Sequence, residues 1–383
     1  MVAQQFNWRR FVQTSLCFAA LAALPFLSVF AACPGPNSDE EVIKEADTWR
    51  PEGGEISPEP TSESNTEQNA DQTNIPSPYS FTRVNVGDSK ALSHMVSTTA
   101  IQIVGGESIF LTEDKSVWLD IAPPALVGSV RNLSIRENRV LAVGGEEAAP
   151  FQGQIMLSKD TGRTWTSVWT GKKDQKDARL RAVAWITETV AVAAGRSGQF
   201  YRTVDRGETW SPLAVGASMT NAQLEGMVLV GSKIFVVGDQ GGIFLTEDNG
   251  ATWKVLQQES SLPTLRDIHF LQDKQTGYAV GAQGAVYRTT DGGATWTRYQ
   301  QIPLPSDDDD LRAISSDGAN RMAIISRKYY YISLNKGNSW ERFGFQESFL
   351  PERSELRGLH FVDKDNLFFL VSDGYILKGA YQP

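Results

Sequence analysis

The sequence predicts an all-β protein, a seven-bladed β-propeller of four-stranded antiparallel blades whose ring is closed by an N-terminal strand. Two observations carry this prediction. A turn motif recurs at a nearly constant spacing, and an apolar strand start recurs in phase with it. The composition agrees, because 33 glycines and 10 tryptophans in 383 residues are typical of turn-rich β structure.

The start of the chain has the pattern of an export signal. Two arginines precede an apolar run over 11–32, which ends in small residues directly before Cys33. This end resembles a bacterial lipobox, in which the cysteine becomes the acylated first residue of the mature protein. We therefore expect a lipoprotein signal peptide over 1–32 and lipidation at Cys33. Cleavage after Ala31, or retention of the segment as a membrane anchor, are the alternatives.

An acidic, polar segment follows over 33–78. Residues 34–78 contain eleven acidic side chains against two basic ones, a balance of −9. Such a segment cannot bury enough apolar surface to offset its ordering entropy, so we expect a disordered tether that holds the folded domain away from a membrane. The remaining chain, 79–383, has 32 basic and 34 acidic residues, and this balance excludes a nucleic acid as the partner.

A box of the form S/T-x-D-x-G-x-T/S-W marks the repeat. Its first and eighth residues in the five full copies are Ser158 and Trp165, Thr203 and Trp210, Thr246 and Trp253, Thr289 and Trp296, and Ser333 and Trp340. A shorter, eroded copy runs from Asp114 to Trp118. The aspartate positions, counting Asn335 in the fifth copy, lie 46, 45, 43, 43 and 44 residues apart. This period is that of a propeller blade.

A second marker begins each unit. Its seven copies are Leu92-Ser93, Val130-Arg131, Leu180-Arg181, Leu224-Glu225, Leu265-Arg266, Leu311-Arg312 and Leu356-Arg357. Each unit continues as apolar strands around a glycine turn, then the box, then a fourth strand. The last unit ends after its third strand, and the segment 81–86 resembles the missing fourth strand. We therefore predict one propeller domain over 79–383, closed by this strand.

The repeats resemble the BNR or Asp-box propeller superfamily. Within it, the stretch 277–296 looks most like the photosystem II stability and assembly factor type. The resemblance implies that the box links the third and fourth strands of each blade. It also implies relatives among lumenal lipoproteins that assist photosystem assembly, and among bacterial envelope proteins without a photosynthetic role.

The box has the composition of a structural turn. Its aspartate can accept hydrogen bonds from turn amides, its glycine allows positive φ, and its tryptophan covers the outer edge of the blade. We assign a structural role to Asp160, Trp165, Asp205, Trp210, Asp248, Trp253, Asp291, Trp296, Asn335 and Trp340.

Arginines after the strand starts are the candidate binding site. The antiparallel order of the strands places the start of the first strand at one mouth of the ring and the box at the opposite face. The predicted partner-binding residues are Arg131, Arg181, Arg266, Arg312 and Arg357, joined by Arg327 and Lys328 from a loop. Guanidinium groups in this arrangement bind carboxylates or phosphates. The alternative is a structural role, in which they bind carbonyls or acids such as Asp307–Asp310.

Other polar residues are weaker candidates. His269 and His360 occupy equivalent positions, which favours repeat-encoded packing. Asp307–Asp310 lacks the alternating spacing of a calcium loop, so we expect a solvated loop. Glu146-Glu147 lies in an enlarged loop that could confer specificity. We assign no catalytic residue, no metal site and no cofactor.

The leading functional hypothesis is a non-catalytic cell-envelope lipoprotein, a protein-binding scaffold or assembly factor that acts through its arginine-rich axial mouth. Its partner would be an envelope or membrane protein. We expect a monomer, exported and held by its N-terminal lipid, in the periplasm or on the outer surface. The alternative is a glycan-binding protein or a sialidase-like glycoside hydrolase, since sialidases also combine such boxes with an arginine cluster.

Overall fold

The structure is a computed structural model. It describes residues 77–382 apart from 87–89, 116, 147–150, 173–178, 216–218, 220, 301 and 306–309. The predicted signal peptide (1–32), Cys33 and nearly all of the predicted tether (33–78) lie outside the described residues. No helix in the described part of the chain is long and apolar enough to cross a membrane.

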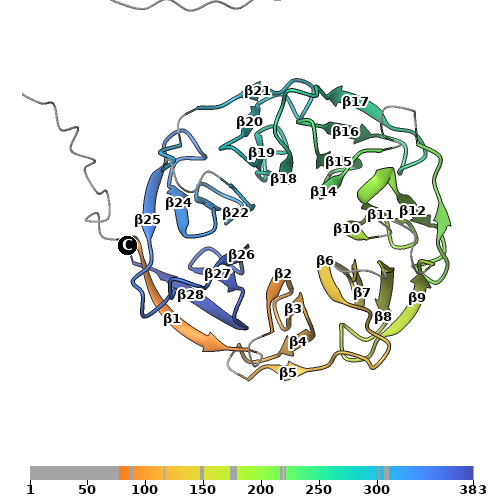
Figure 1. Ribbon diagram of the computed structural model, residues 1–383, viewed down its shortest axis with the longest axis horizontal. Coiled ribbons are helices and arrows are strands. Elements are labelled where there is room, and N and C mark those ends of the chain that lie inside the picture. Colours follow the sequence, from red (N-terminus) through yellow and green to blue (C-terminus); the bar gives the residue numbers. More distant parts are fainter. Residues whose placement is uncertain are drawn as a thin grey trace, which may run out of the picture. The chain divides into compact units, whose positions relative to one another are not determined.

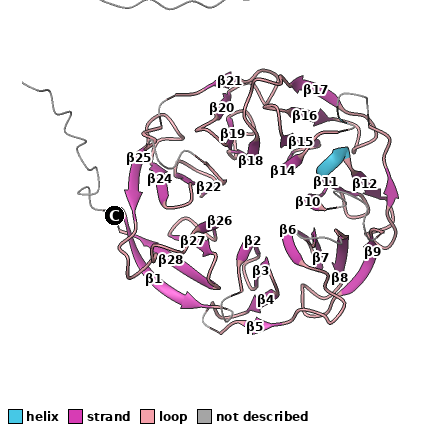
Figure 2. Ribbon diagram, in the orientation of Figure 1, coloured by secondary structure: helices cyan, strands magenta, loops and turns pink. Residues whose placement is uncertain are grey.

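Seven four-stranded antiparallel sheets surround one axis, which confirms the predicted propeller (Figure 1). In each sheet one strand lies nearest the axis and the others follow outward. The described elements are strands, together with the short 3-10 turn η2 (Arg196–Gly198) (Figure 2).

Blades one to four follow one another along the chain. Blade one contains β2 (Leu92–Ser97), β3 (Gln102–Gly106), β4 (Ile109–Thr112) and β5 (Leu119–Asp120), and blade two contains β6 (Ser129–Arg136), β7 (Arg139–Gly145), β8 (Gly153–Ser158) and β9 (Thr166–Thr170). Blade three contains β10 (Leu180–Trp185), β11 (Ala191–Gly195), β12 (Phe200–Thr203) and β13 (Ser211–Pro212). Blade four contains β14 (Leu224–Val230), β15 (Lys233–Gly238), β16 (Ile243–Thr246) and β17 (Lys254–Gln257).

Blades five to seven complete the ring. Blade five contains β18 (Leu265–Phe270), β19 (Gly277–Gly281), β20 (Val286–Thr289) and β21 (Thr297–Arg298). Blade six contains β22 (Ala313–Ser316), β23 (Met322–Ile325), β24 (Tyr329–Ser333) and β25 (Glu341–Gly344). Blade seven contains β26 (Leu356–Phe361), β27 (Asn366–Val371), β28 (Tyr375–Tyr381) and β1 (Tyr79–Asn85). The predicted strand starts open the inner strands, with β22 beginning directly after Arg312.

The N-terminal strand closes the ring as predicted. β1 pairs with β28 in an antiparallel register that runs from Tyr79 opposite Tyr381 to Asn85 opposite Tyr375. The strand begins two residues before the predicted start at Phe81, because Tyr79 is itself buried and packs edge-on against Tyr381. β1 thus pairs with the outer edge of β28, which the last unit of the chain would otherwise leave open.

Apolar side chains fill the space between neighbouring blades. Phe235 of blade four, for example, stacks on Phe270 of blade five with ring centroids 5.0 Å apart, and Leu265 and Ile268 join the same cluster. The second strand β19 is buried along its whole length, and β3, β11 and β23 are buried in the same way. This packing fixes each blade relative to the next and holds the inner strands around the axis.

Each box forms a hydrogen-bonded turn between the third and fourth strands. In blade three the Asp205 carboxylate accepts the Thr209 N–H at 3.0 Å and the Thr209 hydroxyl at 2.5 Å. The Gly207 N–H donates to the Thr203 hydroxyl at 3.0 Å, and Gly207 has φ +84°. The Trp210 indole N–H donates to the Gly207 carbonyl at 3.1 Å. The aspartate, the hydroxyl groups and the tryptophan of this copy are thus all bonded within the turn, whereas the indole N–H groups of Trp165 and Trp253 have no hydrogen-bond partner among the described residues.

We expect Asp248→Ala to lower the free energy of unfolding by about 1–2 kcal/mol, since Thr252 loses two hydrogen bonds and Thr246 loses one. Asp248→Asn should cost less than half of this. Asn335 already occupies the position in blade six, where its side chain accepts the Ser339 N–H at 2.9 Å and donates to the Ser339 hydroxyl at 2.8 Å. Urea unfolding measures the stability of both variants. Equal losses of stability in Asp248→Ala and Asp248→Asn would contradict the hydrogen-bonding role of this side chain in the turn.

Candidate functional site: the axial cavity

A β-bulge near the start of the inner strands sets the direction of the arginine side chains. In blade three the pairing of β10 with β11 shifts between Leu180 and Ala182, so Arg181 is the extra residue. The same shift in five further inner strands places Ser93, Arg131, Glu225, Arg266 and Arg357 at the bulge. A bulged residue leaves the alternating pattern of its strand, which re-aims its side chain.

A glycine at the end of the second strand makes room for the bulge. A Cβ atom on Gly195, which lies opposite Leu180, would come within 2.2 Å of the Arg179 carbonyl oxygen. The equivalent distances for Gly106, Gly144, Gly238 and Gly281 are 1.9, 1.9, 2.3 and 2.1 Å. In blades one to five the bulge and this glycine occur together, whereas in blade seven Val371 lies opposite Leu356 beside the same bulge.

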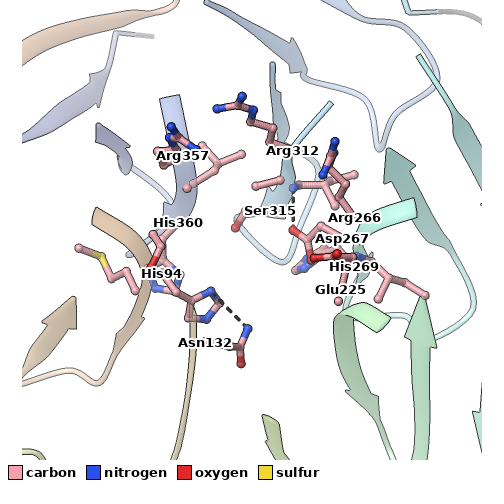
Figure 3. Close-up of a pocket in the computed structure, with 18 of the residues that line it drawn as sticks. His94, Asn132, Glu225, Arg266, Asp267, His269, Arg312, Ser315, Arg357 and His360 are labelled. Atoms are coloured by element: carbon pink, nitrogen blue, oxygen red, sulfur yellow. Dashed lines mark hydrogen bonds between the residues drawn. The ribbon is translucent and has the colours of Figure 1, made fainter. Parts of the chain in front are cut away.

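The bulged side chains meet in a cavity of about 540 Å³ that is lined by all seven inner strands (Figure 3). All five arginines that follow the strand starts line it: Arg131, Arg181, Arg266, Arg312 and Arg357. Arg327 and Lys328 do not line it among the described residues. The Lys328 ammonium instead donates to the backbone carbonyls of Glu352 and Ser354. Partner binding by these residues stays a prediction.

Acidic side chains link three of the arginines into a chain of ion pairs. Asp310 binds Arg266 at 2.8 Å and Arg312 at 3.5 Å. Glu355 binds Arg312 at 3.0 Å and Arg357 at 3.1 Å. Burial would raise the pKa of Glu355, but the hydrogen bond from Arg312 and the nearby positive charges hold it below its usual value.

A second, looser group lies on blades three and four. Glu225 is 3.7 Å from Arg181 and 3.6 Å from Arg196. Together with Asp310, these contacts correspond to the pairing of arginines with acids that the sequence left open as a structural role. Asp307–Asp309, from the predicted solvated loop, and Glu147, from the predicted enlarged loop, lie outside the described residues.

Three histidines line the same cavity, and the sequence-based interpretation had assigned two of them to packing. His269 bonds to the Ser316 hydroxyl at 2.7 Å, and His360 bonds to the Ser97 hydroxyl at 2.8 Å, in each case across a blade boundary. His94 lies 3.5 Å from the Asn132 amide nitrogen. Figure 3 shows His94 and His360 on neighbouring strands. The histidines thus join adjacent blades and also form part of the cavity wall.

Other polar side chains also bridge the inner strands. The Asp267 carboxylate accepts the Ile314 N–H of the next blade at 2.9 Å, and the Ser315 hydroxyl accepts the Phe361 N–H at 3.2 Å. Asp267 stands one residue after Arg266 and Ser315 stands three residues after Arg312, and a search at these offsets from the strand-start arginines could have located them. The cavity wall is therefore held by side chains whose hydrogen bonds cross from blade to blade.

The surroundings shift the pKa values of the buried groups in opposite directions. Burial disfavours a charged imidazole, so it lowers the pKa of His94 and His269 to about 4. It lowers the pKa of His360 to about 3, with a further contribution from the other two histidines. Burial raises the pKa of Asp267 to about 6, although two backbone N–H groups partly oppose this. At neutral pH the histidines are uncharged.

We expect the thermal midpoint to fall by roughly 5–10 °C as the pH decreases from about 6.5 to about 4. In this window the unfolded histidines, with pKa near 6.5, bind protons that the folded ones do not. Asp267 opposes the trend, because its folded form keeps a proton up to about pH 6 and its unfolded form only to about 3.8. Three histidines outweigh this one carboxyl.

A His360→Gln variant tests this expectation, because it removes one titrating group and can still bind Ser97. Its thermal midpoint should depend less steeply on pH between 6.5 and 4. Hydrogen bonds from threonines hold the pKa of the box residues Asp248 and Asp291 at about 2, so protonation of these carboxylates affects the thermal midpoint only at lower pH. If the thermal midpoint of the variant depends on pH as steeply as that of the wild type, His360 is not one of the groups that cause the pH dependence.

The cavity has the chemistry of an anion-binding site. Its wall contains five arginines and three acids (Glu225, Asp267 and Asp310), a net charge of +2 with neutral histidines. Each acid already binds arginines or backbone amides, and no tyrosine is among the described residues of the wall. Guanidinium groups that hold one acid keep further N–H donors for a second carboxylate or phosphate.

A family model described as "Photosynthesis system II assembly factor YCF48" matches residues 149–262 and 257–356, together more than half of the chain. No curated protein matches the sequence. The comparisons therefore bear out the resemblance noted in the repeats.

Solved structures share the propeller fold. A structure described as "YCF48 bound to D1 peptide" has a TM-score of 0.61 and 15% identity, and the match covers 80% of this chain and 96% of that one. YCF48 from Cyanidioschyzon merolae has a TM-score of 0.62 and 14% identity, with coverages of 79% and 99%. A GH74 enzyme from Niastella koreensis has a TM-score of 0.59 and 17% identity, with coverages of 78% and 53%.

Proposed function

The chain belongs to the family of the photosynthesis system II assembly factor YCF48, and on this premise we propose that it is a non-catalytic scaffold or assembly factor whose axial cavity binds an acidic segment of another protein. The observation that carries the proposal is the set of bulges that aim arginines at one opening. A peptide bound to a YCF48 propeller of the same fold supports a protein partner.

The electrostatics favour an extended acidic peptide over a neutral one. The net charge of +2 on the cavity wall attracts carboxylates, and the walls of low dielectric strengthen the field inside the opening. Three of the arginines are already positioned by Asp310 and Glu355. A partner carboxylate would therefore bind guanidinium groups that are already held in place, and ordering these arginine side chains on binding would cost little entropy.

We expect the double variant Arg266→Gln and Arg312→Gln to bind an acidic peptide about 30-fold more weakly, through the loss of two charge-assisted contacts. The probe is a fluorescein-labelled synthetic peptide that ends in two glutamates, measured by fluorescence anisotropy. Arg298→Gln, in the exposed outer strand β21, is the control with the same kind of charge change. Unchanged affinity in the double variant, with an unchanged thermal midpoint, would reject the arginine cavity as the binding site.

We also propose that the protein acts as a monomer held at a membrane of the bacterial envelope, in the periplasm or on the outer surface. The apolar run over 11–32 and the cysteine that follows it support this proposal. Acyl chains would anchor the protein through roughly 0.8 kcal/mol for each buried CH₂ group. Radioactive palmitate should label the wild type and not Cys33→Ser. If the wild-type protein does not incorporate palmitate, the lipidation proposal is wrong and cleavage after Ala31 is favoured.

A glycan-directed function is the second candidate. The elevated pKa of Asp267, in the same cavity wall as two further acids, is the observation that favours it, and the fold is shared with a GH74 enzyme. Both Asp267 oxygens, however, accept backbone N–H groups, which suits a structural carboxyl better than a proton donor. Release of the chromophore from chromogenic sialosides or β-glycosides would favour the enzyme over the scaffold.

A further inference from the structure

Three of the five arginines in the axial cavity form a row on neighbouring blades. Arg266, Arg312 and Arg357 follow the strand starts of blades five, six and seven, and Figure 3 shows them in this part of the wall. Asp310 joins the first two members of the row, and Glu355 joins the last two. We call these three residues the arginine row. Its members differ in how many of their N–H groups the protein itself uses.

The middle arginine is held from both sides and is the least exposed of the three. The Arg312 Nη1 group donates to the Glu355 carboxylate and to the Leu356 carbonyl, both at 3.0 Å. Its Nε atom lies 3.5 Å from the Asp310 carboxylate, and the side chain is 16% exposed. Only Nη2 has no partner among the described residues. This guanidinium group therefore mainly connects the starts of blades six and seven.

The two outer arginines keep most of their donors. Arg266 makes one hydrogen bond to the described part of the chain, from Nε to Asp310 at 2.8 Å, so both of its terminal nitrogens remain available. Arg357 makes one ion pair there, with Glu355 at 3.1 Å. Their side chains are 38% and 43% exposed. A guanidinium group binds a carboxylate through two parallel N–H···O bonds, so each outer arginine can still bind a ligand in this way.

The two acids of the row are themselves fixed by the backbone. The Leu311 N–H, next to Asp310, donates to the Gly281 carbonyl at 3.1 Å, and the Glu355 N–H donates to the Ser372 hydroxyl at 3.0 Å. Each acid therefore holds two arginines from a defined place between two blades. Three arginines and two acids leave the row a net charge of +1. The acids weaken the field of the row, but they also order long side chains that a ligand would otherwise have to order.

We propose that Arg266 and Arg357 each bind one acidic group of the same partner segment. Arg312 between them is a structural brace that offers a ligand only its Nη2 group, and Asp310 and Glu355 are positioning residues. This inference rests on the proposed function. It predicts that the partner segment has two acidic groups, at a spacing set by the brace. It also predicts that the acids of the row strengthen the binding of an acidic ligand, although their charge alone would weaken it.

The first experiment varies the number and spacing of acidic groups in the ligand. Labelled ten-residue peptides contain two glutamates separated by zero to four serines, and in the matched peptides one glutamate is glutamine. At the best spacing we expect the second glutamate to raise the affinity about ten-fold in the wild type and in the control Arg298→Gln. In Arg266→Gln and in Arg357→Gln the gain should fall below about two-fold. A gain at no spacing, or one that survives in either of these two variants, overturns the assignment of two carboxylate sites.

Asp310→Asn separates positioning from charge. The net charge of the cavity wall rises from +2 to +3, so charge alone predicts tighter binding of the two-glutamate peptide. We expect binding about three- to ten-fold weaker instead, with most of the loss recovered in Asp310→Glu. The control Glu208→Gln also removes an acid that binds two bases, Arg139 and Lys159, but in the box of blade three, and should change the affinity less than about two-fold. Unchanged or tighter binding by Asp310→Asn overturns the positioning role.

Thermal unfolding tests the brace. We expect Arg312→Gln to lower the thermal midpoint by roughly 3–5 °C and Arg266→Gln by less than about 1 °C, because only the first side chain binds on both sides. Equal midpoints in the two variants overturn the brace. If no two-glutamate peptide binds the wild type, the proposed function fails and this inference fails with it. If the peptides bind but the variants do not differ as described, the inference alone is wrong.

Discussion

Replacing Gly281 with alanine is expected to lower the free energy of unfolding by about 3 kcal/mol or more. Gly281 ends β19 opposite Leu265, the residue directly before the bulged Arg266. The added methyl group would lie 2.1 Å from the Thr264 carbonyl oxygen and 2.7 Å from the Leu265 Cα atom. Both are backbone atoms at the start of β18, which pairs with β19 in the same blade, so neither can move without disturbing the sheet. Guanidinium unfolding followed by tryptophan fluorescence measures the loss.

Gly344→Ala is the matched control for this variant. Gly344 ends the outer strand β25, and a Cβ atom there would meet only the Tyr329 ring, at 3.8 Å. We expect its stability to change by less than about 0.5 kcal/mol. Gly281→Ala should also weaken binding of the acidic peptide, because Arg266 would be displaced. A change in stability as small as that of the control would contradict the paired role of glycine and bulge.

Phe81→Ala is expected to cost about 3 kcal/mol, because it removes the main apolar anchor of the closing strand. The Phe81 ring in β1 packs against Phe345, Tyr330 and Phe369 with centroids 4.9, 5.6 and 5.8 Å apart. These residues belong to blades six and seven, so one ring joins the N-terminal strand to both. The loss would expose a cluster of aromatic rings to water.

Thr82→Ala, at the next position of β1, separates this effect from a general sensitivity of the strand. Thr82 is exposed, so we expect a change within about 0.5 kcal/mol. Limited proteolysis provides a second measurement, since a weakened closing strand should be cut before the blades unfold. Equal losses in the two variants would show that the side chain of Phe81 does not secure the closure.

The fold could be predicted because the sequence repeats it. The box and the strand start recur with one period, and the missing strand of the last unit was found at the other end of the chain. The gathering of the arginines followed from the direction of the strands. Lys328 was predicted to lie in a loop near the same mouth, and its role in partner binding stays a prediction. A loop position does not reveal that backbone carbonyls of another loop bind its ammonium group.

Contacts across blade boundaries were harder to predict. Asp310 and Glu355 each stand directly before a Leu-Arg strand start and bind the arginine of the preceding blade as well as that of their own, so this spacing is a signal that could be searched for. The cavity position of His269 was missed for a different reason. The bulge changes which side chains of the inner strand face the axis, and the alternation of apolar residues does not reveal that change.

The clasp between β1 and β28 also governs how the protein can fold. Tyr79 and Tyr381 are paired across 302 sequence positions, which makes this the longest-range contact that the register of the ring contains. Loop-closure entropy delays such contacts, and topologies rich in them fold slowly. Each blade can assemble from its own hairpins, but the circle is completed only when both ends of the domain are present. A truncation from either end therefore leaves an open ring with unpaired strand edges that can pair with another chain, even though most of the repeats are intact.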